Sequence, residues 1–376
     1  MSLAMLGIGT ATPRRQIAQA DAAALAAGFA NAEPGHERAL AAIYRQTRIR
    51  TRGSVLLEDP AGEPFAQTFF PPADADTGGG PSTAARMARY AAEAGPLAVD
   101  AARAAVARSG LDPAHVTHLV TCSCTGFANP GVDLDIVRGL GLPADVSRTH
   151  VGFMGCHGAF NALRVAEAFA AAQPSAVVVV VCVELCSLHF QYGSRSDAVV
   201  ANSIFADGAA AVVGVGCDHP LAADADWALD RQWSRLLPDS TGEMGWLIGD
   251  HGFEMSLSAR VPGIISREIT GLVTTALADE RLTAADVAAW AVHPGGPRVL
   301  ANVRDALGLS DHMLAASHEV LASHGNMSSA TILFILERML PEADGPCLAM
   351  AFGPGLTAEL ALFTPCALGR KLRDDE

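Results

Sequence analysis

The sequence predicts an α/β fold of two similar halves that together form five alternating layers of helices and sheets (αβαβα). The first observation is an internal repeat: the pattern Leu-x-x-Ala-x-Val at residues 111–116 recurs at 282–287. Each copy follows an alanine-rich helical stretch and precedes a strand-like segment, a second helix and two further apolar strands. The second observation is this alternation, which favours mainly parallel sheets, one per half, around a shared helical layer. We expect the halves to divide into 1–222 and 223–376.

Each predicted element follows from its apolar pattern and the residues that bound it. Residues 1–9 form a buried first strand that breaks at Gly9. The longest apolar run, Ala176–Val183, has the length of a buried strand and is too short to span a bilayer, which takes about 20 residues. The remaining elements of the two copies are helices at 95–109, 159–172, 264–279 and 328–340 and strands at 118–124, 209–215, 288–294, 347–352 and 357–363.

Composition narrows the class of protein. A chain of 376 residues, 50% of them hydrophobic, is large enough for two core-forming units. Its formal charge of −14 argues against nucleic acid as a partner. The eight cysteines lie in apolar contexts, which is typical of free thiols in a reducing compartment, and the start lacks the basic region of a signal peptide. We therefore expect a cytoplasmic protein without a membrane span.

One cysteine stands out as a candidate nucleophile. Cys156 lies in a glycine-flanked turn, Gly155-Cys156-His157-Gly158, at the start of a predicted helix, where free backbone N–H groups and the helix dipole favour a thiolate. The alternative reading is a small core residue. The cysteine pairs 122/124 and 182/186 are explained by strand alternation, so no metal site is predicted.

Two further residues complete a candidate site. His293 ends an apolar strand before a Pro-Gly-Gly turn, where an imidazole can pair with a thiolate; a structural histidine is the alternative. Asn326 precedes a predicted helix, where it either caps the helix or donates to an oxyanion. Because Cys156 and Asn326 occupy matching positions of the repeat, a pseudo-twofold axis is expected to bring them together.

These residues lie in motifs that resemble the thiolase superfamily and, within it, the type III polyketide synthases, the chalcone-synthase-like family. The motifs are the Gly155-Cys156 turn, Phe205-Ala206-Asp207-Gly208, the segment 290–297, Gly325-Asn326-Met327-Ser328-Ser329 and Phe352-Gly353-Pro354-Gly355. The resemblance implies a duplicated thiolase-like fold and a bacterial-type member. It also implies that Cys156 accepts the acyl group while His293 and Asn326 stabilise an extender enolate.

The resemblance further implies a set of substrate-binding positions. Phe205 and Met255 match the two gatekeepers of the site, and Met255 departs from the aromatic residue of the plant enzymes. The other cavity positions implied are Cys124, Thr125, Cys186, His189, Trp246 and Ser328. Cys124, Cys186 and His189 replace residues that are usually threonine in plants, and Trp246 replaces a glycine, so plant substrates are not transferable. Ordinary core packing is the alternative for Phe205, Met255 and Trp246.

The implied reaction loads an acyl-CoA starter on Cys156 and extends it by decarboxylative condensation with malonyl-CoA, with no cofactor. An alkylpyrone, an alkylresorcinol or a small polyhydroxylated aromatic would be the product. A cluster of four arginines is predicted to contact CoA phosphates, with solvated surface as the alternative: Arg45, Arg48, Arg50 and Arg52. A homodimer is expected from the family alone.

Two other functions stay open at this point. The first is a carrier-protein-dependent condensing enzyme like 3-ketoacyl synthase III, which would need a basic docking surface on this acidic chain. The second is an acyl-binding protein of the same fold that has lost condensation, which the intact Cys, His and Asn set argues against.

Overall fold

The computed structural model describes residues 2–29, 36–58, 66–73 and 78–366. Its main feature is a sheet of nine strands. In spatial order these are β11 (Ala289–Val292), β12 (Cys347–Gly353), β13 (Thr357–Pro365), β8 (Trp227–Leu236), β1 (Leu3–Ala11), β7 (Asp207–Gly216), β6 (Val177–Leu185), β4 (His118–Ser123) and β5 (Ser147–Gly152).

The strand order repeats, as the sequence pattern predicts. In the first half β4 pairs in parallel with β6, which is followed by the antiparallel strands β7 and β1. In the second half β11 pairs in parallel with β12, which is followed by the antiparallel strands β13 and β8.

The expectation of two separate, mainly parallel sheets is wrong. Within the described residues only the β4–β5, β4–β6 and β11–β12 pairs of the large sheet are parallel. The halves join where Leu3–Met5 of β1 pairs with residues 227–229 of β8. Apolar alternation does not distinguish a parallel from an antiparallel buried strand, so the sequence could not reveal the strand directions.

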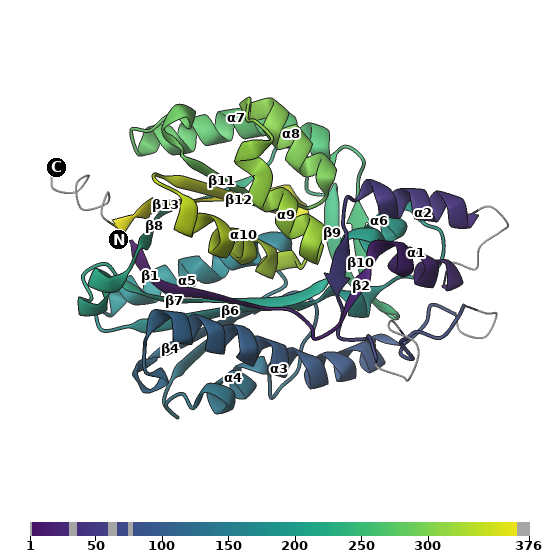
Figure 1. The fold of residues 1–376 in the computed structure, drawn as a ribbon, viewed down its shortest axis with the longest axis horizontal. Coiled ribbons are helices and arrows are strands. Elements are labelled where there is room, and N and C mark those ends of the chain that lie inside the picture. The colour runs from purple at the N-terminus through teal and green to yellow at the C-terminus, as the bar shows by residue number, and fades with distance from the viewer. Residues whose placement is uncertain (1, 30–35, 59–65, 74–77, 367–376) are drawn as a thin grey trace.

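Helices cover both faces of each half sheet and produce the five layers (Figure 1). Helices α3 (Thr83–Ser109) and α4 (Val132–Leu140) form one outer layer, and α7 (Val261–Asp279) and α8 (Pro297–Leu307) form the other. Helices α5 (Gly158–Ala172) and α10 (Thr331–Met339) lie between the half sheets. Three hydrophobic clusters fill the spaces, and the central one joins α5 and α10 to strands of both halves.

Helix α3 begins 12 residues before the predicted start at Gly95. Ser82 caps it by accepting a hydrogen bond from the Ala85 amide, and the helix continues through Pro96. Proline usually marks a helix start, so the Gly95-Pro96 pair misplaced the boundary. Close packing on α4 explains the glycine, because a Cβ at Gly95 would lie 2.2 Å from the carboxylate of Asp135.

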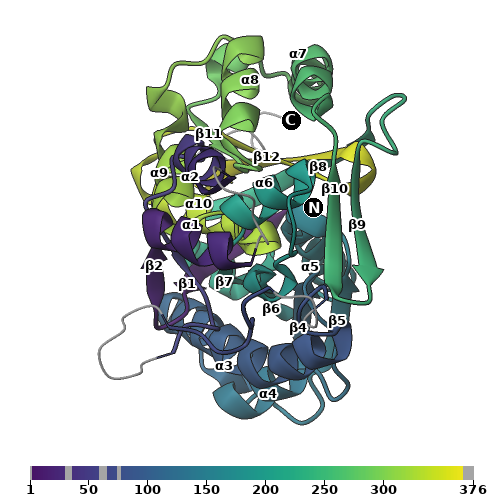
Figure 2. The same cartoon turned by 90° about the vertical axis from the view of Figure 1, so that its right-hand side faces the viewer.

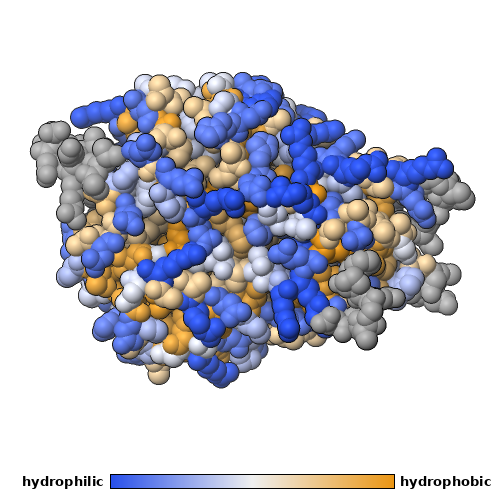
Figure 3. Space-filling view, in the orientation of Figure 1, coloured by the Kyte–Doolittle hydropathy of each residue, from blue (hydrophilic) through white to orange (hydrophobic). Residues whose placement is uncertain are grey.

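Smaller elements close one end of the layered body (Figures 1 and 2). They are β2 (Gln16–Ala18), α1 (Gln19–Gly28), α2 (His36–Gln46), β3 (Thr51–Gly53), α6 (Ser196–Ile204), α9 (Ala315–His324) and the hairpin of β9 (Met244–Gly249) and β10 (Gly252–Leu257). In the part of the chain that the structure describes, no helix has the length and apolarity to cross a membrane. The face in Figure 3 mixes hydrophilic side chains with smaller hydrophobic areas.

Candidate active site

Cys156 lies in a short 3-10 turn, Gly155–His157, directly before α5. Gly155 has φ +73°, and a Cβ there would lie 2.3 Å from the Pro354 ring, so only glycine fits. The Gly155 amide donates to the Cys124 sulfur at 2.8 Å. These contacts fix the turn, and they leave the Cys156 side chain almost fully buried at the N-terminal end of α5.

Asn326 lies just before the turn that leads into α10 and faces Cys156. Its Oδ1 accepts from the Ser328 amide at 2.8 Å, which ties the side chain to the start of that turn. Its Nδ2 points to the Cys156 sulfur at 4.0 Å. A backbone bridge to Phe205 fixes the residue. The repeat therefore does bring the cysteine and the amide of the two halves into contact.

His293 follows β11 and is 1% exposed, with its amide donating to Met350 O at 2.9 Å. Neither ring nitrogen has a hydrogen-bond partner among the described residues. An unpaired buried imidazole is costly unless a ligand satisfies it. His293, Asn326 and Cys156 line one cavity of about 440 Å³, so the ring is free to meet a substrate there.

The charge state of this site depends on opposing effects of burial and hydrogen bonding. Burial raises the pKa of the Cys156 thiol to about 11, although hydrogen bonds from Ser328 and Asn326 favour the thiolate. Burial lowers the pKa of His293 to about 3. Burial thus opposes the predicted resting thiolate, whereas the hydrogen bonds and the helix terminus favour it, so the thiolate stays a prediction. Burial favours the neutral form of both the thiol and the imidazole.

Two more cavities lie beside the first. A small one of about 20 Å³ borders Cys156 and is lined by Cys124, Thr125, Cys186, Trp246 and Ser328. Another, of about 110 Å³, extends toward α1 and is lined by Cys186, His189 and Trp246 among others. Phe205 and Met255 line all three cavities. Every substrate-binding residue expected from the sequence thus lines one of them, and the two expected gatekeepers lie at their junction.

Trp246 and His189 form a wall in this system. Trp246 Nε1 donates to Cys124 O at 2.8 Å, and His189 Nε2 donates to Thr125 O at 2.6 Å. His189 Nδ1 accepts from the Phe253 amide, and burial lowers the pKa of this histidine to about 3. Since its polar atoms are all engaged, His189 offers a ligand only its ring.

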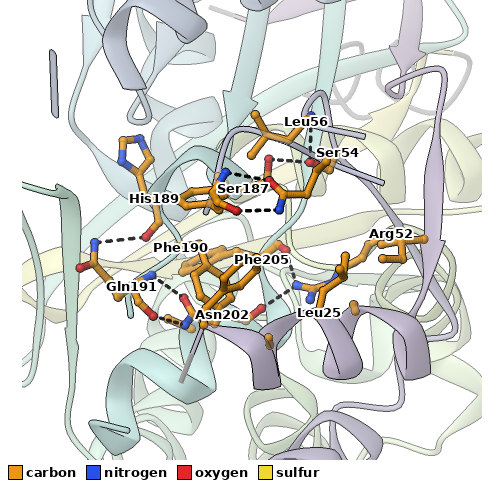
Figure 4. Close-up of a pocket in the computed structure, with 18 of the residues that line it drawn as sticks. Leu25, Arg52, Ser54, Leu56, Ser187, His189, Phe190, Gln191, Asn202 and Phe205 are labelled. Carbon is orange, nitrogen blue, oxygen red and sulfur yellow. Dashed lines mark hydrogen bonds between the residues drawn. The ribbon is translucent and has the colours of Figure 1, made fainter. Parts of the chain in front are cut away.

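The cavity beside α1 presents apolar groups to its interior. Leu25, Phe29, Leu56, Phe70 and Phe190 contribute to its lining. Its polar lining residues bond to one another (Figure 4): Ser54 to Ser187, and Asn202 to the backbone of Gln191. The cavity therefore suits an aliphatic ligand.

The arginine group at 45–52 does not line the large cavity. Arg52 is buried and donates to the carbonyls of Asn202 and Phe205, both at 2.7 Å. Arg50 pairs with Glu319 at 2.5 Å. Arg52 is therefore tied to the fold by its hydrogen bonds, whereas Arg50 is 59% exposed, and the phosphate contact of the four arginines stays a prediction. The cation that lines the cavity is Arg298, which the sequence reasoning missed.

Glu184 was also missed as part of the site. It is fully buried at the end of β6 and accepts hydrogen bonds from the Cys124 amide, Thr125 Oγ1 and the Ser329 hydroxyl. Burial raises its pKa, while those donors oppose the shift. It braces the segments that carry the cavity residues. Its sequence signal was a single acid in a run of apolar strand residues.

Comparison with known proteins agrees with the geometry. The model of the N-terminal domain of chalcone and stilbene synthases matches residues 2–219, and that of their C-terminal domain matches 229–366. The alpha-pyrone synthesis polyketide synthase-like Pks18 of Mycobacterium tuberculosis is 35% identical over 363 residues, covering 95% of this chain and 90% of the relative. The 1,3,6,8-tetrahydroxynaphthalene synthase of Streptomyces peucetius is 35% identical, covering 94% and 91%.

Solved structures extend the similarity to three dimensions. PKS-I from the brown alga Ectocarpus siliculosus superposes with a TM-score of 0.88 at 30% identity, covering 97% of this chain and 98% of that one. The C-terminal type III polyketide synthase domain of Steely1 from Dictyostelium gives 0.86 at 26%, covering 97% and 99%. The chain belongs to the chalcone and stilbene synthase family, and it is a type III polyketide synthase, a condensing acyltransferase with the thiolase-like fold.

Proposed function

We propose that Cys156 carries the growing chain and that His293 and Asn326 stabilise the extender enolate. An acyl-CoA transfers its acyl group to the Cys156 sulfur and releases CoA thiol. Malonyl-CoA then loses carbon dioxide, and the resulting enolate attacks the Cys156 thioester to form the new carbon-carbon bond. The 4.0 Å approach of the Asn326 amide to the sulfur is the observation that carries this proposal.

The neutral imidazole fits the enolate role. Burial disfavours the protonated form of His293. The neutral ring can still donate its N–H to the thioester oxygen as negative charge develops on that oxygen. The Asn326 Nδ2 is the second donor. Removing one donor of this kind costs about 3 to 4 kcal/mol of transition-state stabilisation.

The neutral thiol sets the proton balance. In the loading step the Cys156 proton passes to the leaving CoA sulfur, so no proton is exchanged with solvent. In each extension the carboxylate leaves as carbon dioxide and the cysteine departs as a thiolate. Because its pKa lies near 11, that thiolate takes up one proton per extension.

The cavity beside α1 supports a starter with an aliphatic chain. It shares Cys186, Phe205, Trp246 and Met255 with the small cavity at Cys156, so an acyl tail on the sulfur can reach it past these four residues. The names of the two bacterial relatives point to a pyrone and to a polyhydroxylated naphthalene. The apolar lining favours an alkylpyrone or an alkylresorcinol over a small polyhydroxylated aromatic without an alkyl chain.

Mass spectrometry of reactions with malonyl-CoA alone and with a series of straight-chain acyl-CoA starters tests the proposal. We expect carbon dioxide release and polyketides that contain the starter, with aliphatic starters preferred over malonyl-CoA alone. Turnover only when the extender is supplied on a carrier protein would instead indicate the 3-ketoacyl synthase III-like activity. Acyl binding without condensation would indicate a protein that has lost turnover.

A further inference from the structure

The large cavity is lined by one charged side chain that has no partner among the described residues. Arg298 and Asp197 are the charged residues among those that line this cavity in the described chain. Asp197 has partners of its own: Arg195 Nε, which belongs to a side chain that also pairs with Glu254, lies 2.8 Å from its Oδ1, and that oxygen also accepts from the Ala198 amide at 2.8 Å. Arg298 is exposed, and its guanidinium has no ion-pair or hydrogen-bond partner within the described ranges.

Arg298 also lies close enough to His293 for one CoA thioester to contact both residues. It is in the first turn of α8, five residues after His293, so the two Cα atoms lie within about 18 Å of each other. The cavity that contains the sulfur, the imidazole and the amide continues to this residue. A thioester of CoA has its reactive carbonyl at one end of the pantetheine arm and its phosphates at the other.

We propose that Arg298 binds the phosphate groups of the CoA carrier and so sets the affinity for CoA thioesters, an inference that rests on the proposed function. A guanidinium presents paired donors that match phosphate oxygens. The unpaired positive charge favours an anion at this position, against the overall charge of −14 of the chain. Arg298 thus joins Arg45, Arg48, Arg50 and Arg52 as a residue predicted to contact CoA phosphates.

The test compares malonyl-CoA with malonyl-N-acetylcysteamine, which carries the same thioester and no phosphate. Arg298→Ala is expected to raise the KM for malonyl-CoA by about tenfold, equivalent to ~1.4 kcal/mol. The same variant should leave kcat and the KM for malonyl-N-acetylcysteamine within about twofold of the wild type. Arg298→Glu should raise the KM for malonyl-CoA further, and Arg298→Lys should restore part of the affinity.

Arg304→Ala is the matched control. Arg304 lies on the same helix, but Asp305 and Asp311 already pair with it and it does not line the cavity. It should leave both KM values unchanged. If Arg298→Ala raises the KM for both thioesters equally, or leaves the KM for malonyl-CoA unchanged, the inference is overturned. The proposed function still stands in that case, provided that the wild type is active. A wild type that turns over neither thioester would overturn both.

Discussion

Replacing Trp246 with alanine should join the small cavity at Cys156 to the cavity beside α1. The indole lines both of them and is held there by its hydrogen bond to Cys124 O. Its removal leaves that carbonyl without a donor and breaks ring contacts with His189, Phe205 and Phe253 at centroid distances of 5.5, 6.1 and 6.0 Å. We expect unfolding to become easier by about 3 kcal/mol.

The larger cavity of Trp246→Ala should change which acyl-CoA starters the enzyme prefers. Each further methylene buried in the joined cavity contributes about 0.8 kcal/mol, so two methylenes correspond to more than a tenfold preference. Competition between short and long straight-chain acyl-CoA starters, read by mass spectrometry of the products, should therefore shift toward the longer chains by at least about tenfold.

Trp246→Phe controls for this change because it keeps most of the ring while losing the N–H donor. It should retain the wild-type starter profile with a smaller loss of stability. If Trp246→Ala remains folded, as judged by circular dichroism, and still shows the wild-type profile, then Trp246 does not separate the two cavities and the reasoning from the wall is refuted.

Three further results are expected. The rate of Cys156 alkylation by iodoacetamide should be slow at pH 7 and rise steadily toward pH 10, since a pKa near 11 leaves little thiolate at neutral pH; a plateau below pH 8, measured by peptide mass spectrometry, would contradict the neutral thiol. Leu25→Trp should fill the cavity beside α1 and lower the ratio of long-chain to short-chain products about tenfold, whereas Leu247→Ala, an exposed position on β9, should not change that ratio. His293→Gln should lower kcat about a hundredfold or more while the KM for malonyl-CoA changes less, and an equal effect on both would argue against a role in the transition state.

Much of the architecture could be predicted because the strands of both repeats are runs of apolar residues. Ala176–Val183 was placed within two residues of β6, and the strands at 347–352 and 357–363 match β12 and β13. Strand β8 was missed because Asp230, Arg231 and Arg235 interrupt its apolar pattern. The division of the chain at residue 222 and the homodimer stay predictions.

For the site, too, the sequence predicts positions better than it predicts the surroundings of each side chain. Sequence position placed Cys156 and Asn326 together because each precedes an equivalent helix, and motif similarity found the residues around the cavities. The thiol's charge state depends on how many atoms surround the sulfur, which no local pattern reveals. Likewise, Arg52 and Arg298 differ only in what the folded chain places beside them.

The measurement that tests the central claim most directly is carbon dioxide release from malonyl-CoA by Cys156→Ala and Asn326→Ala, followed beside product formation. If Asn326 stabilises the enolate and Cys156 only holds the chain, Cys156→Ala forms no polyketide yet still releases carbon dioxide, whereas Asn326→Ala does neither. Decarboxylation that survives equally in both variants would contradict these roles.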